Sequence, residues 1–187
     1  MDEESLETIK KNTPIRSVLN NTELQICVAV NKLNKIKTCQ YFFGSISRLG
    51  DGIFWYLIVL LLPFVKGLEG LNVSINMIVN ALACLIIYLY VKKLFRRRRP
   101  FHSNLNLIVS TPALDRYSFP SGHSMHAVCF SSTIISIYPE LLWILLPFVI
   151  CLCMSRLILG LHYPSDVLVG ILIGGFFGQF NFNYVAY

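Results

Sequence analysis

Residues 155–166 read Ser-Arg-Leu-Ile-Leu-Gly-Leu-His-Tyr-Pro-Ser-Asp and stand between two of the most apolar runs of the chain. Arg156 comes where the first run ends, His162 lies in the link, and Asp166 comes where the second run begins. Gly160 is a typical helix stop, and Pro164 suits the first turn of a new helix. The segment therefore predicts two apolar helices joined by a short link that carries charged and ionisable side chains.

The rest of the chain is also strongly apolar. Of its 187 residues, 55% are hydrophobic, and they come in long runs instead of amphipathic periods. We therefore predict an all-α integral membrane protein, a bundle whose five transmembrane helices cover the runs 52–68, 73–94, 123–138, 141–159 and 167–182. Several runs are shorter than the about 20 residues of a full span, so their polar ends would lie near the lipid headgroups.

The N-terminal part has a different composition. Residues 24–43 mix apolar side chains with Lys32, Lys35 and Lys37, which favours an amphipathic helix lying in the membrane interface. Two alternatives are a solvated helix that packs on the domain and a sixth span. We expect residues 1–23 to form a flexible arm and residues 24–187 to form a single membrane domain.

The predicted helices bring distant polar segments together. Short connections at 66–72 and 138–140 indicate antiparallel neighbours. Counting the alternations then puts four places on one membrane face: the N-terminal helix, the polar segment 95–119, the His123 end of the third run, and the 156–166 link. Ionisable groups that meet at such a face indicate a functional site.

The link itself suggests acid–base or nucleophilic chemistry. Asp166 follows His162 by four residues and can reach one imidazole nitrogen, which would fix the tautomer and leave the other nitrogen as nucleophile or base. The alternative is a structural His–Asp pair that bridges two helices.

A second cluster opens the third run. Ser121 and Gly122 come just before a predicted helix, where exposed N–H groups bind anions, and His123 would lie at the mouth, suited to protonating a leaving oxygen. An ordinary helix cap that happens to include a histidine would give the same pattern. His126, one turn further on, either lines this pocket or is a hydrogen-bonded core histidine.

The basic residues supply the third cluster. Lys92, Arg99 and Arg156 could contact phosphate oxygens, and Pro100 rigidifies the chain directly after Arg99. The run 96–98 would face lipid headgroups instead, as polybasic segments do. We expect Asp51 to cap the first span, the alternative being a part in the reaction, and we assign Asp115 no chemistry.

The three clusters together resemble the signature of the type 2 phosphatidic acid phosphatase superfamily, which runs Lys-x6-Arg-Pro, Pro-Ser-Gly-His and Ser-Arg-x5-His-x3-Asp. The resemblance covers about residues 44–182. Every position of the signature is matched, by Lys92, Arg99, Pro100, Pro120, Ser121, Gly122, His123, Ser155, Arg156, His162 and Asp166.

The resemblance implies roles for these residues. His162 would be the nucleophile that forms a phosphoenzyme, Asp166 its partner, and His123 the general acid. The phosphate would be held without any metal or other cofactor by Lys92, Arg99, Ser121, Gly122 and Arg156.

These patterns favour a membrane phosphatase or diphosphatase whose substrate is a lipid, such as undecaprenyl diphosphate, phosphatidylglycerol phosphate, phosphatidic acid or lipid A phosphates. Its partners would be that lipid and the bilayer, with no nucleic acid and no obligate protein partner. Two alternatives are a phosphotransferase that passes the phosphate to a lipid acceptor and a non-catalytic lipid-binding bundle.

The orientation in the membrane has two conflicting signals. Every Lys and Arg except Lys66 falls on the face of the predicted site, which by the positive-inside tendency would be cytoplasmic. Bacterial members of the superfamily work mostly at the periplasmic face of the inner membrane, and the resemblance implies that location here.

Overall fold

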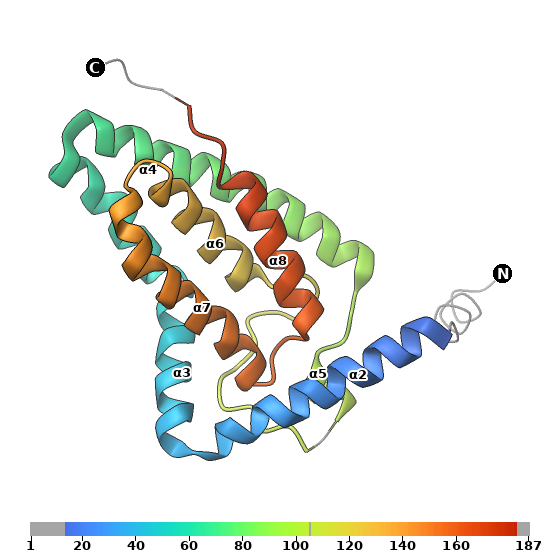
Figure 1. The fold of residues 1–187 in the computed structure, drawn as a ribbon. Helices are drawn as coiled ribbons and strands as arrows, with labels where there is room; N and C mark the ends of the chain where they lie inside the picture. Colours follow the sequence, from blue (N-terminus) through green and yellow to red (C-terminus); the bar gives the residue numbers. More distant parts are fainter. Residues whose placement is uncertain (1–13, 105, 183–187) are drawn as a thin grey trace.

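The computed structural model describes residues 14–104 and 106–182, and within that part all regular structure is helical (Figure 1). This confirms the all-α prediction. In chain order the elements are α2 (Pro14–Asn31), η1 (Lys32–Lys35), α3 (Lys37–Leu49), α4 (Ile53–Phe95), α5 (Pro100–Ser103), α6 (Gly122–Ile135), η2 (Pro139–Leu141), α7 (Leu142–Ile158) and α8 (Pro164–Phe177).

The long helix α4 is a hairpin of two arms, as the short connection at 66–72 predicts (Figure 1). Gly67 breaks it with a φ of 59° and a ψ of −137°, a conformation that other residues adopt at a cost. A Cβ on Gly70 would lie 2.2 Å from the carbonyl oxygen of Leu62, so only glycine lets the arms approach this closely. Ser74 then joins them by donating to the carbonyl of Val59 at 2.8 Å.

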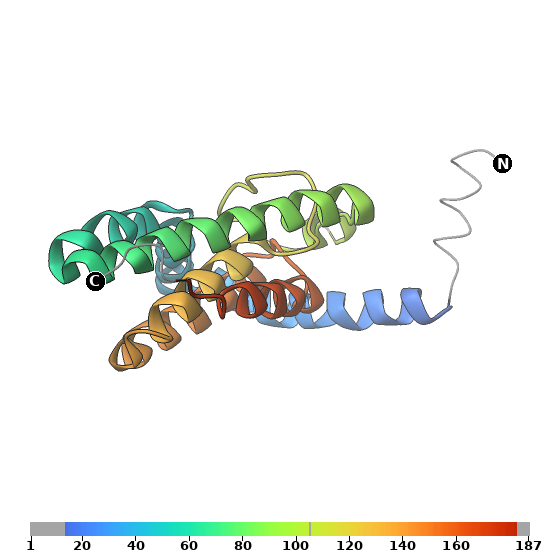
Figure 2. The same cartoon turned by 90° about the horizontal axis from the view of Figure 1, so that it is seen from above.

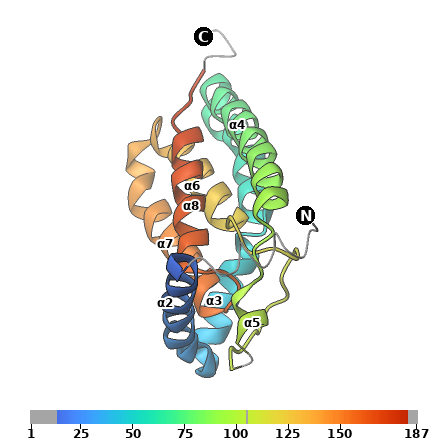
Figure 3. The same cartoon turned by 90° about the vertical axis from the view of Figure 1, so that its right-hand side faces the viewer.

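Helix α6 lies at the centre of the bundle and packs against α4, α7 and α8 (Figure 3). Its Phe130 stacks on Trp55 of the first α4 arm, with ring centroids 5.1 Å apart. Against α8 the contact is between backbones, because a Cβ on Gly174 would lie 2.1 Å from the carbonyl oxygen of Met125. Small residues at helix contacts are a regular device of membrane bundles.

The expected single helix over 24–43 is divided into α2 and α3, so that boundary prediction is wrong. Asn31 ends α2 and hydrogen-bonds the backbone of Ile108 and Ile158, while Asn34 donates to Ile108, and these contacts fix the chain where it turns. Helix α2 packs on α7 and α8 and extends past the bundle at its N-terminal end (Figures 1 and 2).

The proposed division of the chain at residue 23 stays a prediction. Helix α2 begins at Pro14, inside the expected arm, whereas residues 1–13 of that arm lie outside the described residues.

The number of spans also stays a prediction. Among the described residues, two segments are long and apolar enough to cross a membrane, Ile53–Ser103 and Pro139–Ile158, and the first contains both arms of α4. Helices α6 and α8 have 14 residues each. Such a helix is about 21 Å long, against about 30 Å of hydrocarbon, so by itself it is short for a span.

Candidate active site

A cavity of about 1020 Å³ opens between the arms of α4 and the start of α6. Most of its wall is apolar, and its polar groups gather at one end. The predicted site residues that line it are Arg99, Gly122, His123, Arg156 and His162. Lys92, Ser121 and Asp166 are buried just outside the wall.

His162 lies in the loop between α7 and α8, which Gly160 starts with a φ of 72°. Its Nδ1 donates to the carbonyl oxygen of Ser118 at 2.7 Å, and Arg99 Nη1 lies 3.2 Å from its Nε2. A carbonyl only accepts and a guanidinium only donates, so the ring carries its proton on Nδ1 and has a lone pair on Nε2. Burial lowers the pKa of His162 well below its usual value, and the charges of Arg156 and Arg99 lower it further.

Asp166 is less directly attached to His162 than expected. Its Oδ2 is 3.6 Å from Nδ1, and the hydrogen bond from that nitrogen goes to Ser118 instead. The same Oδ2 accepts from the N–H of Tyr163 at 2.8 Å and so caps α8. Asp166 therefore lies beside His162 without a hydrogen bond to it, and the Ser118 carbonyl fixes the tautomer.

The side chain of Arg97 does not lie where we expected it. We expected it to face headgroups with Arg96 and Arg98, but only these two are exposed. Arg97 Nη1 pairs with Asp166 at 2.8 Å, and Nη2 pairs with Glu23 of α2. Its guanidinium thus joins α2 to the start of α8.

Asp115, to which we assigned no chemistry, lies among the phosphate-binding candidates. Its Oδ1 pairs with Arg99 Nη2 at 2.9 Å, and its Oδ2 contacts Lys92 and accepts from the Tyr88 hydroxyl at 2.6 Å. Burial opposes its ionisation, but the hydrogen bonds from Lys92 and Tyr88 outweigh burial and hold the pKa of Asp115 at about 2. A charged carboxylate therefore connects Lys92 and Arg99.

Arg156 is the least compensated of these cations. It is 2% exposed, its Nη1 donates to Ser47, and its buried Nε has no hydrogen-bond partner among the described residues. Within the same part of the chain no carboxylate forms an ion pair with it. A buried cation of this kind is costly without an anion nearby, which suits a phosphate contact.

Ser121 and Gly122 start α6 in the way that the sequence indicates. Ser121 is fully buried, its Oγ caps the helix by accepting from Ser124 N–H at 3.4 Å, and its hydroxyl contacts the Ser124 hydroxyl. A Cβ on Gly122 would lie 2.8 Å from the ring of Tyr88, so glycine keeps the helix start open at the cavity. The Ser121 hydroxyl serves the helix here and does not line the cavity.

Asp51 does not cap the first span, so that expectation is wrong. The residue at the cap position of α4 is Gly52, with no side-chain hydrogen bond, and the Asp51 carboxylate contacts Nε2 of His123. His126 is half-buried and lines the cavity, so it is not a core histidine, although its Nδ1 does donate to the carbonyl of Gly122 at 2.9 Å.

The donor set does not suit a metal ion. Within residues 14–104 and 106–182, no three His, Cys, Asp or Glu side chains gather as a group that could hold one. The carboxylates at the cavity already have protein partners, Lys92 and Arg99 for Asp115 and His123 for Asp51. Independence from metals stays a prediction.

Comparisons with known proteins agree with the sequence signature. Over 142 residues the chain is 25% identical to an undecaprenyl-diphosphatase of Sulfolobus acidocaldarius, covering 75% of this chain and 68% of the relative. Over 94 residues it is 35% identical to a decaprenylphosphoryl-5-phosphoribose phosphatase of Mycobacterium tuberculosis, covering 49% of this chain and 50% of the relative.

Two crystal structures share the fold. A transmembrane PAP2 type phosphatidylglycerolphosphate phosphatase from Bacillus subtilis aligns with a TM-score of 0.72 and 21% identity over 89% of this chain and 84% of that one. LpxE of Aquifex aeolicus aligns with a TM-score of 0.68 and 22% identity over 80% of this chain and 90% of that one. The family model of the PAP2 superfamily matches residues 70–187, which carry the whole signature. The chain therefore belongs to the PAP2 superfamily.

Proposed function

We propose that this PAP2 protein is a metal-independent membrane phosphatase that hydrolyses a lipid phosphomonoester or diphosphate through a phosphohistidine on His162. The observation that carries the proposal is the cavity, which has His162, Arg99 and Arg156 at one end and apolar side chains over the remainder. A phosphorylated headgroup fits the first part and a lipid tail fits the second.

The apolar part follows the hairpin of α4. Leu71 and Phe64 line it near the kink, and Tyr88 lines it beside the cations. The second arm between Leu71 and Tyr88 is about 25 Å long by helical rise, close to the thickness of the hydrocarbon layer. A tail could therefore lie along the hairpin while its headgroup stays at the polar end.

The chemistry follows from the atoms at that end. The lone pair on His162 Nε2 attacks phosphorus, the bond from phosphorus to the leaving oxygen breaks, and His123 gives that oxygen a proton. Water then attacks the phosphohistidine, His123 takes back a proton, and the P–N bond breaks to release phosphate. Arg99, Lys92 and Arg156 stabilise the negative charge on the transferring group.

The names of the relatives support lipid substrates of several kinds. They include polyprenyl diphosphate and polyprenyl-phosphoribose phosphatases, a phosphatidylglycerolphosphate phosphatase and lipid A 1-phosphatases. The matched part spans half or less of the mycobacterial and Rhizobium relatives. The whole proteins' substrates are therefore candidates for this chain.

The test is release of phosphate from undecaprenyl diphosphate, phosphatidylglycerol phosphate, phosphatidic acid and lipid A by the purified protein in EDTA. We expect turnover of at least one lipid, none with His162→Ala, and an alkali-stable phosphohistidine in the wild type. Turnover that stops in EDTA and returns with Mg²⁺ would contradict the proposal. Transfer to an added lipid acceptor would favour a phosphotransferase, and no turnover would favour a binding protein.

We also propose that the site faces the periplasm of a bacterial inner membrane. The support is the superfamily resemblance, which here opposes the charge bias. Labelling of Asn104→Cys by an impermeant maleimide in intact cells is expected. Labelling only after permeabilisation would put the site in the cytoplasm.

A further inference from the structure

The turn between α3 and α4 is built to hold Asp51 in one place. A Cβ on Gly50 would lie 2.3 Å from a methyl carbon of Leu152, so the turn is pressed against α7. Gly52 has a φ of 123°, a conformation that side-chain-bearing residues rarely adopt. Asp51 therefore stands between two positions that accept only glycine easily.

The held side chain meets the start of α6. The Asp51 carboxylate contacts His123 Nε2, and both residues line the polar end of the cavity together with Arg156. The His123 side chain is 11% exposed and that of Asp51 is 34% exposed, so the pair forms part of the wall and is open to a ligand. A helix cap does not explain this placement, because the Asp51 side chain makes no capping hydrogen bond.

The two histidines of the site have contrasting neighbours. His162 donates from Nδ1 to a carbonyl and accepts at Nε2 from the Arg99 guanidinium, which suits a neutral ring, and the Asp166 carboxylate lies farther off, 3.6 Å from Nδ1. His123 has a carboxylate on Nε2, which stabilises a positive ring relative to the same ring without it. The partners of His123 therefore suit the acid, and those of His162 suit the nucleophile.

We propose that Asp51 is the positioning residue for proton transfer to the leaving group. Its carboxylate holds the Nε2–H of His123, so Nδ1 is the nitrogen that gives its proton to the leaving oxygen. In the second step the same Nδ1 takes one proton from the attacking water, so the ring again carries a proton on each nitrogen. This inference rests on the phosphatase function proposed above.

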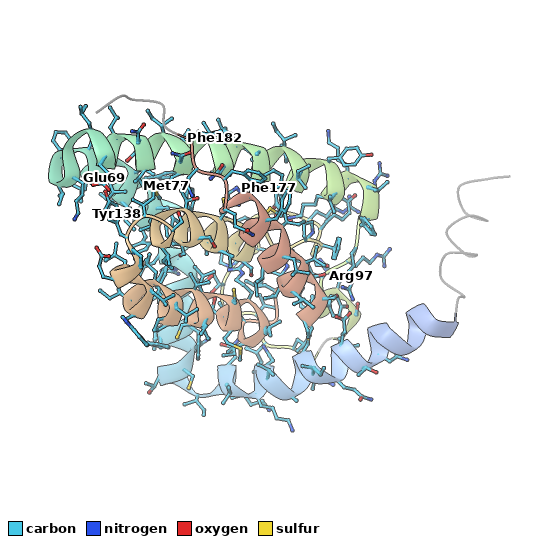
Figure 4. All side chains as sticks on the ribbon, turned by 45° about the horizontal axis from the view of Figure 1, so that its top comes forward. Glu69, Met77, Arg97, Tyr138, Phe177 and Phe182 are labelled. Carbon is cyan, nitrogen blue, oxygen red and sulfur yellow. The ribbon has the colours of Figure 1, made fainter. Side chains whose placement is uncertain are left out.

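Leaving groups of different basicity provide the test. Protonation matters for a lipid phosphate, whose leaving oxygen is basic, and matters little for 4-nitrophenyl phosphate. We expect Asp51→Asn to reduce kcat about 10²-fold on the lipid and less than about fivefold on the nitrophenyl ester. Asp51→Glu should restore part of the loss, and Glu69→Gln is the matched control, since Glu69 lies at the other end of the bundle from Arg97 (Figure 4).

A double variant distinguishes positioning from a separate effect. If Asp51 acts through His123, then Asp51→Asn added to His123→Ala should cause no further loss, because coupled residues are not additive. The inference would be overturned if the loss of kcat in the double variant were the product of the two single losses. Equal losses of kcat on the lipid and on 4-nitrophenyl phosphate would also overturn it. The ratio of the rates on the lipid and on 4-nitrophenyl phosphate does not change when part of a preparation is unfolded. This ratio therefore tests the role of Asp51 even if the variant is unstable.

Failure of the wider proposal looks different. A wild-type protein without phosphatase activity, or an active His162→Ala variant, would remove the function itself. In a different outcome, the wild type is active through His162 while Asp51→Asn loses the same factor in kcat on both substrates. That result would exclude only the role of Asp51.

Discussion

The Nδ1 atom of His162 donates a hydrogen bond to the carbonyl oxygen of Ser118 over 2.7 Å. Ser118 is itself fixed, because its N–H donates to the carbonyl of Arg97 at 2.8 Å and its hydroxyl donates to that of Arg98 at 3.1 Å. The loop before α6 thus orients the proposed nucleophile by its backbone, and no side chain can be exchanged to remove that bond.

This hydrogen bond predicts the tautomer and the charge of His162. Its pKa lies well below the usual value, so the ring should stay neutral down to a pH clearly under about 6.5, where an ordinary histidine becomes charged. Because the unfolded chain binds the proton first, the free energy of unfolding should fall as the pH drops below that value. Nitrogen NMR of ring-labelled protein, with His162→Gln for assignment, should show a proton on Nδ1 at pH 6. A proton on Nε2, or a charged ring at pH 7, would contradict the geometry.

The basic run 96–99 should divide into three effects. Arg99→Ala should lower kcat by about 10²–10³-fold at every salt concentration, since it removes a positioned donor. Arg97→Ala should destabilise the fold by about 3–5 kcal/mol, because Asp166 is then left buried without its guanidinium. Changing Arg96 and Arg98 together should mainly raise KM at low salt, because each lost charge weakens attraction to the anionic lipid surface by about 1 kcal/mol. Thermal unfolding and salt-dependent kinetics separate these cases, and a stable Arg97→Ala protein would disprove the assigned contact network.

Asp115→Asn should make the protein depend on an anion. The carboxylate neutralises Lys92 and Arg99, and its pKa of about 2 keeps it charged at any working pH. Its contribution to stability is present above the ordinary pKa of about 3.9 and is lost as the pH falls toward 2. Without it, the melting temperature should drop in anion-free buffer and recover with phosphate more than the wild type gains. Phosphate at about 100 times its Kd would contribute about 2.7 kcal/mol. Equal gains in both proteins would show that Asp115 does not compete with phosphate.

Ile78→Trp should fill the apolar part of the cavity. Ile78 lines it, whereas Ile86 on the same arm is 67% exposed and does not, so Ile86→Trp is the matched control. We expect kcat/KM for a long-tailed lipid phosphate to fall about tenfold, which is about 1.4 kcal/mol, with little change for 4-nitrophenyl phosphate. A similar loss on both substrates would mean that the tail does not bind between the arms of α4.

The sequence predicts the helices and the gathering of the signature residues well, because both depend on local patterns. Gly160 and Pro164 mark the end of α7 and the start of α8 as expected. The pairing of side chains from separate segments depends on how far each one reaches, which spacing does not encode. Arg97 is indistinguishable from Arg96 and Arg98 as a letter in a basic run, and only the fold turns it toward Asp166.

The partners of Asp51 and Asp115 could not be predicted, for the same reason. Both stand in loops, where no periodicity indicates the direction of a side chain. One signal was available for Asp51, since a carboxylate between Gly50 and Gly52 suggests a turn under tight geometric control. For Asp115 the only signal was its proximity along the chain to the motif at 120–123.

Glu23 has a consequence for how proteins of this kind are compared. It lies on α2, outside the matched range 70–187, yet it accepts from Ser165 N–H at 2.8 Å and pairs with Arg97, which in turn holds Asp166 beside His162. The position of the signature residue Asp166 thus depends on a helix that the signature does not include. Two relatives with identical motifs but different N-terminal helices would differ in how firmly the proposed nucleophile is held, so their rates could diverge where no motif has changed.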